Sequence, residues 1–196
     1  NKILKDFGLL KRVFVAFIPT AVIGFALYKL IKHYLLGSPE VVLISLLVGG
    51  VALIGVELMF ARRAEKRNAK SEIPSYEQAF VVGLFQSIAI IPGVSRSAST
   101  IVGGMLLGLN RTTATEFSFL LAVPTMLAAT ALDLKETNFS FSSNEWTILA
   151  VGFITSFIVA LASIKWLLKY VKSNNFIPFG IYRITLALLY FLLILK

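Results

Sequence analysis

The sequence predicts an all-α polytopic membrane protein, formed as one integral membrane domain over residues 1–196. Hydrophobic residues make up 57% of the chain and charged residues only 15%, a more apolar composition than that of soluble domains. The mean hydropathy is +0.83. Five apolar stretches are long enough to cross ~30 Å of hydrocarbon. Two further apolar stretches are too short to cross, and they flank a proline and a glycine.

The boundaries of the five expected spanning helices follow from turn and capping residues. The first two are separated by Gly37-Ser38-Pro39, which ends one helix and starts the next. The third begins with Thr113-Ala114-Thr115-Glu116, the pattern of a capping box. A polar loop over 135–144 precedes the fourth. The expected spans are 13–31, 41–60, 115–134, 146–168 and 177–195.

Between the second and third spans, residues 76–110 are predicted to form a re-entrant helical hairpin. Lys and Arg accumulate in cytoplasmic loops, and Lys70 and Arg111 flank this segment, so both of its ends belong on one face. The same bias assigns the other basic clusters to that face and leaves four Lys on the opposite one. The thirteen inside charges are Lys2, Lys5, Lys11, Arg12, Arg62, Arg63, Lys66, Arg67, Lys70, Arg111, Lys165, Lys169 and Lys172; the four outside are Lys29, Lys32, Lys135 and Lys196.

The centre of the hairpin reads Pro92-Gly93-Val94-Ser95-Arg96-Ser97-Ala98-Ser99-Thr100. Pro92 and Gly93 break the helix, and an arginine at membrane depth is a functional hypothesis by default. If a second helix begins near residues 95–97, its free N–H groups lie beside Arg96 and form a receptor for a phosphate-like anion. Helical spacing places Arg96, Ser99 and Thr100 on one face. Gly104-x-x-x-Gly108 is expected to admit a neighbouring helix closely.

A structural interpretation of the same residues remains open. Serines in apolar helices bond the carbonyls of the preceding turn, and arginine can extend to lipid phosphates. Gln86 either faces the same cavity or makes an interhelical hydrogen bond. Arg183 either extends to the interface or pairs with an acid. Glu57, Glu116 and His33 are weaker candidates, with a capping and dipole role expected for Glu116 and a solvated interfacial position for His33.

Composition excludes several classes of site. The chain has no cysteine and one histidine, which rules out disulfides, thiolate zinc sites and a His-rich metal site. The net charge of +9 is accounted for by membrane sidedness and anionic lipid. Nucleic acid is therefore not expected as a partner.

The chain resembles the bacterial undecaprenyl pyrophosphate phosphatase family of the bacitracin-resistance type, over nearly its whole length. The specific motif is Pro92-Gly93-x-Ser95-Arg96-Ser97-x-x-Thr100. Further matching residues are Tyr76-Glu77-Gln78-Ala79-Phe80, Gly83, Phe85-Gln86, Gly103-Gly104-Met105, the run from Glu116 to Pro124, Ala131-Leu132-Asp133, and Phe176 to Arg183.

The resemblance implies an inverted-repeat membrane enzyme of the bacterial inner membrane, with its site open to the outer face. It implies hydrolysis of undecaprenyl pyrophosphate to the monophosphate carrier of cell-wall synthesis, and a role in bacitracin resistance. Arg96 would clamp the pyrophosphate, Ser95 would bond it and Thr100 would support the site. Gly93, Ser97, Ser99 and Gln86 would complete the binding site. Membrane lipid and a second copy of the chain are the other expected partners.

One departure from the family is serious. The glutamate-rich motif and its Pro-x-Ser-Ser-x-Gly-His sequence, which the resemblance implies for a divalent cation (Mg²⁺ or Ca²⁺) and for the chemistry, do not occur here. His33 does not replace that histidine. We therefore expect the chain to lack an N-terminal hairpin and one helix of the full protein. The 196 residues alone are expected to be inactive.

Three alternative functions make different demands on these residues. Acid-phosphatase-like lipid phosphatases need His six residues after the arginine and Asp four beyond, where this chain has Val102 and Leu106. A transporter of an anionic or polyprenyl phosphate substrate would use the same broken helix. A purely structural membrane subunit would tolerate Arg96→Ala without loss of any activity.

Overall fold

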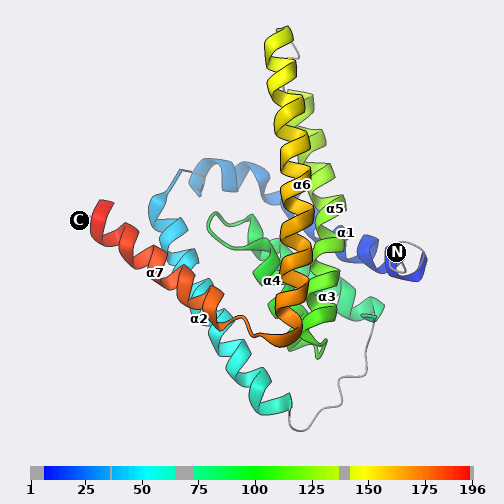
Figure 1. The fold of residues 1–196 in the computed structure, drawn as a ribbon, viewed down its shortest axis with the longest axis vertical. Coiled ribbons are helices and arrows are strands. Elements are labelled where there is room, and N and C mark those ends of the chain that lie inside the picture. Colours follow the sequence, from blue (N-terminus) through cyan, green and yellow to red (C-terminus); the bar gives the residue numbers. More distant parts are fainter. Residues whose placement is uncertain (1–6, 36, 65–72, 137–141, 195–196) are drawn as a thin grey trace.

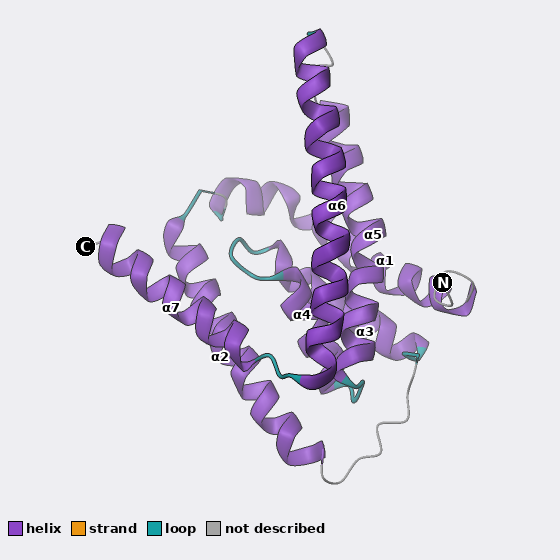
Figure 2. Ribbon diagram, in the orientation of Figure 1, coloured by secondary structure: helices purple, strands orange, loops and turns teal. Residues whose placement is uncertain are grey.

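The computed structural model describes residues 7–35, 37–64, 73–136 and 142–194. Within these residues every regular element is a helix (Figures 1 and 2), as predicted for an all-α protein. The elements are α1 (Phe7–Tyr34), α2 (Pro39–Ala64), α3 (Tyr76–Ser87), the 3-10 turn η2 (Ile88–Ile90), α4 (Arg96–Leu106), α5 (Arg111–Glu136), α6 (Ser143–Ser173) and α7 (Ile177–Ile194).

Four described helices, α1, α2, α5 and α6, are long and apolar enough to cross a membrane. The fifth expected span is the shorter helix α7, whose apolar part is Ile177–Leu193. Its 18 residues extend about 27 Å at ~1.5 Å per residue, slightly less than the hydrocarbon core. Helix α6 continues past the expected end at 168 to Ser173, and Asn175 Oδ1 accepts a hydrogen bond from the N–H of Ile177, where α7 begins.

Helices α3 and α4 form the re-entrant hairpin. They have 12 and 11 residues, so each extends only about 16–18 Å at ~1.5 Å per residue. At the start of α3, Gln78 Nε2 donates a hydrogen bond of 3.0 Å to the carbonyl of Leu107, just beyond the end of α4. The hairpin therefore enters and leaves at the same end of the molecule.

The ends of several other helices meet at this same end. The Arg12 guanidinium of α1 lies 4.7 Å from the centre of the Tyr76 ring at the start of α3. Near the end of α2, Glu57 pairs with Arg111 at 2.6 Å and accepts from the Phe176 N–H at 3.0 Å. These contacts place the N-terminal part of α1, the C-terminal part of α2, the start of α5 and the junction of α6 with α7 at the end of the molecule where the hairpin begins and ends. Lys2, Lys5, Lys66, Arg67, Lys70 and Lys196 lie outside the described residues, and the side chains of Lys29, Lys32, His33, Arg62 and Arg63 are likewise not described.

Two apolar clusters hold the hairpin in place. One joins α2, α4, α5 and the junction of α6 with α7, and the other joins α1, α3 and α5. Two glycines allow close contacts of the hairpin: a Cβ on Gly83 would overlap the Ala16 carbonyl of α1, and one on Gly103 of α4 would lie 2.6 Å from the Phe85 ring of α3. Helices α5 and α6 extend together away from this core (Figure 1), and none of the residues in the apolar window of α6 is buried.

Two local predictions were wrong. Helix α5 begins at Arg111 because Asn110 caps it, with Asn110 Oδ1 accepting from the Thr113 N–H at 2.8 Å, so Thr113 is not the cap. Gly108 has φ +92° and lies in the turn that ends α4, because α4 stops at Leu106. Gly104 of the expected glycine pair does face a helix, with its Cβ position 3.1 Å from the Ala114 Cβ of α5.

Candidate functional site

The hairpin turns at Pro92 and Gly93, between η2 and α4. The N–H of Ile91 bonds the Ile88 carbonyl and the N–H of Val94 bonds the Ile91 carbonyl, each at 3.1 Å. Gly93 has φ +84°, a conformation that favours glycine. Its Cβ position would lie 2.7 Å from the Val42 carbonyl oxygen of α2, so the turn rests directly on the α2 backbone.

Helix α4 begins at the predicted place. Ser95 is its N-cap, and Ser95 Oγ accepts from the Ala98 N–H at 3.2 Å. The Ser95 carbonyl accepts from the Ser99 N–H at 2.9 Å. The N–H groups of Arg96 and Ser97 have no partner inside the helix, because first-turn amides precede the first available carbonyl. Together with the helix dipole they favour an anion at this end.

Arg96 is the first residue of α4 and is half-buried. Its Nη1 atom is buried and has no hydrogen-bond partner among the described residues. An unpaired buried donor on a charged group is costly, and an anion beside the first turn would satisfy it. Arg96 and the α4 amides are thus brought together as the sequence predicted for an anion receptor.

The hydroxyl groups of Ser97, Ser99 and Thr100 lie in different surroundings. Ser97 Oγ lies 3.3 Å from Ser95 Oγ, and Ser99 Oγ donates to the Ser95 carbonyl at 3.1 Å. Thr100 is 1% exposed, and its Oγ1 lies 2.6 Å from Ser118 Oγ of α5. The expected common face of Arg96, Ser99 and Thr100 is therefore corrected: neighbouring helical residues point about 100° apart, and Thr100 packs against α5 while Ser99 lines a cavity.

Gln86 makes the interhelical hydrogen bonds that the sequence left as one of two possibilities. Its Nε2 donates to Thr20 Oγ1 of α1 and Thr125 Oγ1 of α5, each at 3.0 Å. Both hydroxyls donate to backbone carbonyls, of Gly83 and Leu121, so each can only accept from Gln86. This fixes the amide orientation and leaves Gln86 Oε1, which is buried and unpartnered among the described residues, as an acceptor.

Two cavities share three lining residues, Ser95, Ala98 and Arg183. The larger has a volume of about 510 Å³ and lies between α2, the α3–η2 segment and α4. Its wall is mostly apolar, with Ser45, Ser95, Ser99 and Arg183 as its polar residues. The smaller cavity, of about 240 Å³, includes Ser97 and the aromatic residues Phe176, Phe179 and Tyr182. An apolar chamber therefore adjoins the first turn of α4.

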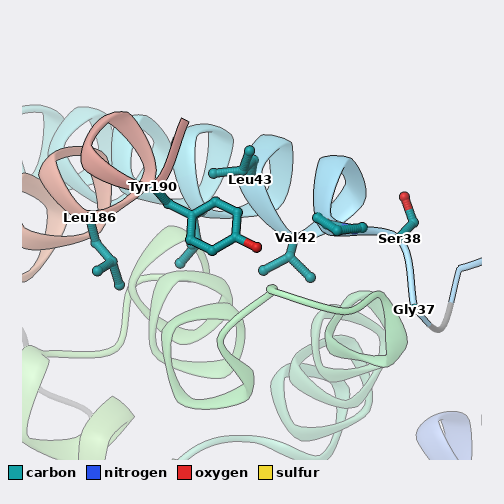
Figure 3. A pocket seen from close by; sticks show the side chains of 8 residues that line it. Gly37, Ser38, Val42, Leu43, Leu186 and Tyr190 are labelled. Atoms are coloured by element: carbon teal, nitrogen blue, oxygen red, sulfur yellow. The ribbon is translucent and has the colours of Figure 1, made fainter. Parts of the chain in front are cut away.

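A third cavity, of about 410 Å³, lies between the start of α2 and the end of α7. Figure 3 shows Tyr190, Leu186, Val42 and Leu43 around it, with Ser38 at its edge. Ser38 Oγ already donates to Glu40 at 2.8 Å. Because none of the described residues that line this cavity has a cationic side chain, it does not resemble an anion site.

Sequence reasoning missed the partners of two charged residues. Arg183 has no ion pair with an acid among the described residues, and its Nη2 donates instead to the carbonyls of Ser45 and Gly93. Glu57, 2% exposed, is paired with Arg111, which the sequence identified only as a topology signal. The only available signal was a charged residue within an apolar helix, and it does not reveal a partner distant in the sequence.

The described residues do not supply a metal site. Among them, no group of three or more His, Cys, Asp or Glu side chains is placed to hold a metal ion. The most buried carboxylate, Glu57, is already bound to Arg111 and the Phe176 N–H. The donor set seen here does not fit a divalent cation.

Comparisons with known proteins agree with the motif. A family model described as bacitracin resistance protein BacA matches residues 3–189. An undecaprenyl-diphosphatase of Aquifex aeolicus is 52% identical over 97% of this chain and 73% of its own length. Those of Sulfurihydrogenibium sp. and Persephonella marina are 51% and 48% identical, over 95% and 100% of this chain and 73% and 76% of theirs. The chain belongs to the bacitracin resistance protein BacA family.

Proposed function

We propose that this protein is a membrane hydrolase that cleaves undecaprenyl pyrophosphate to undecaprenyl phosphate and inorganic phosphate. The observation that carries the proposal is the buried, unpartnered Nη1 of Arg96 at the first turn of α4. Relatives about 50% identical are undecaprenyl-diphosphatases. Hydrolysis breaks a phosphoanhydride bond and adds water across it, so negative charge develops on the phosphoryl group.

Arg96, the N–H groups of the first turn and the Ser95 and Ser97 hydroxyls form the phosphate-holding side of the site. Preorganised donors of this kind stabilise developing charge without reorganising at the moment of reaction. Ser99 lines the adjoining cavity, Gly93 lets the turn approach α2, and Thr100 supports α4 through Ser118. Gln86 acts at a distance by tying α3 to α1 and α5.

The lipid part of the substrate has a suitable place beside this site. The cavity of about 510 Å³ begins at Ser95 and Ser99 and continues between apolar side chains such as Val48, Phe85 and Val102. Apolar cavities with a few polar groups at one end are typical of sites for amphiphilic ligands. The first isoprene units would lie there while the pyrophosphate lies at α4.

The divalent cation and the nucleophile belong, in this proposal, to residues outside the described ones, because the described carboxylates form no ligand group. The enzyme would lie in the bacterial inner membrane, as a homodimer, with the site open to the outer face. The test is to measure phosphate release by the 196-residue chain and by the full-length gene product, each with and without a chelator. Only the full-length gene product should release phosphate, and the chelator should stop it. Chelator-sensitive release by the 196 residues alone would contradict it.

Arg96→Lys in the full-length gene product tests the function itself. Lysine keeps the charge but loses the planar pair of donors, so we expect kcat to fall about 10²- to 10³-fold, the usual loss when one transition-state donor is removed. Lys172→Arg, at the exposed end of α6, is the matched control and should change nothing. Near-normal phosphate release from undecaprenyl pyrophosphate by Arg96→Lys would refute the assignment.

A further inference from the structure

Arg183 joins three segments that are far apart in the sequence. From α7, its Nη2 donates to the Ser45 carbonyl of α2 at 3.1 Å and to the Gly93 carbonyl of the hairpin turn at 3.0 Å. One nitrogen makes both bonds, with one N–H for each. The guanidinium therefore links α2, α7 and the turn that leads into α4.

Glycines create the space for this link. A Cβ on Gly49 would lie 2.6 Å from Arg183 Nη2, so the guanidinium occupies the place of a side chain on α2. Gly50 and Gly180 allow α2 and α7 to approach closely, because the Cβ position of each lies 2.9 Å from the other's carbonyl oxygen. Helices α2 and α7 accordingly run side by side in Figure 1. Their contact sets the position of Arg183 above the turn.

The link bears on the anion site because Gly93 lies two residues before the N-cap of α4. Among the described residues, the Gly93 carbonyl has Arg183 as its hydrogen-bond donor. If that donor is removed, the turn loses a tether to α2, and the first-turn amides and Arg96 lose their fixed direction. Displacements of about 1 Å near a reacting group can lower a rate 10²-fold.

We propose that Arg183 is a positioning residue that holds the Pro92–Gly93 turn on α2 and so orients the phosphate-binding turn of α4. The effect on catalysis rests on the proposed hydrolysis; the effect on the turn does not. Arg183 donates from Nη2 to two neutral backbone carbonyls, whereas Arg96 is proposed to hold a phosphate; the buried Nε of Arg183 and Nη1 of Arg96 both have no hydrogen-bond partner among the described residues. We therefore expect lysine to be tolerated at position 183 but not at position 96, since a lysine ammonium can donate to two carbonyls but cannot reproduce a planar pair of donors.

Gly49→Ala is the sharpest perturbation, because the added methyl displaces only the flexible end of Arg183. Gly55→Ala is the matched control on the same helix, where a Cβ meets nothing within 4 Å. Arg183→Met removes the donors and Arg183→Lys restores one donating nitrogen. The first measurement is amide hydrogen exchange of the peptide covering residues 91–99, in detergent, with the full-length gene product.

We expect exchange in this peptide to be about tenfold faster in Gly49→Ala and Arg183→Met, a change of ~1.4 kcal/mol in the opening equilibrium, and near the parent rate in Gly55→Ala and Arg183→Lys. Unchanged exchange in Gly49→Ala overturns the proposal, even if Arg183→Met fails to fold. This readout needs no activity, so it remains decisive if the protein hydrolyses no pyrophosphate.

The second measurement is steady-state kinetics with undecaprenyl pyrophosphate. We expect Gly49→Ala and Arg183→Met to lower kcat about 10- to 100-fold with KM changed less than about threefold, because the reacting group is misdirected rather than unbound. Arg183→Lys should recover most of the loss, unlike Arg96→Lys. A large rise in KM with kcat unchanged would instead make Arg183 a substrate-binding residue and overturn the positioning role.

Discussion

Glu57 is the residue whose replacement should damage the fold most clearly. Its carboxylate is 2% exposed and accepts from Arg111 Nε at 2.6 and 3.2 Å and from the Phe176 N–H at 3.0 Å. Glu57→Ala leaves both donors without an acceptor. Removing one partner of a buried ion pair costs about 3–5 kcal/mol, because the other charge stays buried and unpaired.

The structure places the expected cost at the lower end of that range. The Arg111 side chain is 28% exposed, so water can recover part of its hydration, and its guanidinium still stacks on the Phe60 ring at 5.1 Å. We expect Glu57→Ala to lower the free energy of unfolding by about 3 kcal/mol. Glu57→Gln keeps an oxygen for the Phe176 N–H and should cost less, about 1.5 kcal/mol, the lower value for a hydrogen bond to a charged group.

The assay is reversible unfolding in mixed detergent micelles, followed by circular dichroism. Glu77→Gln, an exposed carboxylate in the first turn of α3, is the control and should stay within about 1 kcal/mol of the parent. The double variant Glu57→Ala with Arg111→Ala should be less destabilised than the sum of the single variants. A loss below about 0.5 kcal/mol in Glu57→Ala, or additive single losses, would refute the reasoning.

The remaining predictions concern packing of the hairpin and use the same unfolding assay. Gly83→Ala should lower the free energy of unfolding by at least about 2 kcal/mol, because the new Cβ overlaps the Ala16 carbonyl. Its control Gly55→Ala should be neutral or stabilising. Equal effects of the two substitutions would contradict the close α1–α3 contact. Thr100→Val should cost about 1–3 kcal/mol, because it removes the hydroxyl 2.6 Å from buried Ser118 Oγ. Thr100→Ser, which keeps the hydroxyl, should cost less, and the reverse order would count against this hydrogen bond.

The parts of the candidate site that follow from local chemistry were predictable. A proline followed directly by a glycine favours a break in an apolar run, and Ser95 caps the helix that follows, so the broken element and its anion-binding turn could be predicted. Loop charge then required both ends of the hairpin to lie on one face. The Gln78 to Leu107 hydrogen bond agrees with that requirement.

Local patterns were less reliable where several signals compete within a few residues. Asn110, rather than Thr113, caps α5, because an earlier residue with capping ability starts the helix first. Gly108 fits a small-residue packing motif and a helix-ending turn equally well by spacing. Its φ of +92° results from the α4–α5 connection, which the spacing does not describe.

The sequence by itself determined that this is an all-α membrane protein with a broken, re-entrant helix carrying Arg96 at its centre. Those conclusions depend on hydropathy, helix-breaking residues and loop charge, all of which act over a few turns of chain. Only the tertiary structure decided the partners of Arg183, Glu57 and Gln86. Each of these side chains bonds groups far away in the sequence, and such pairings arise only when the helices and the turns between them pack together.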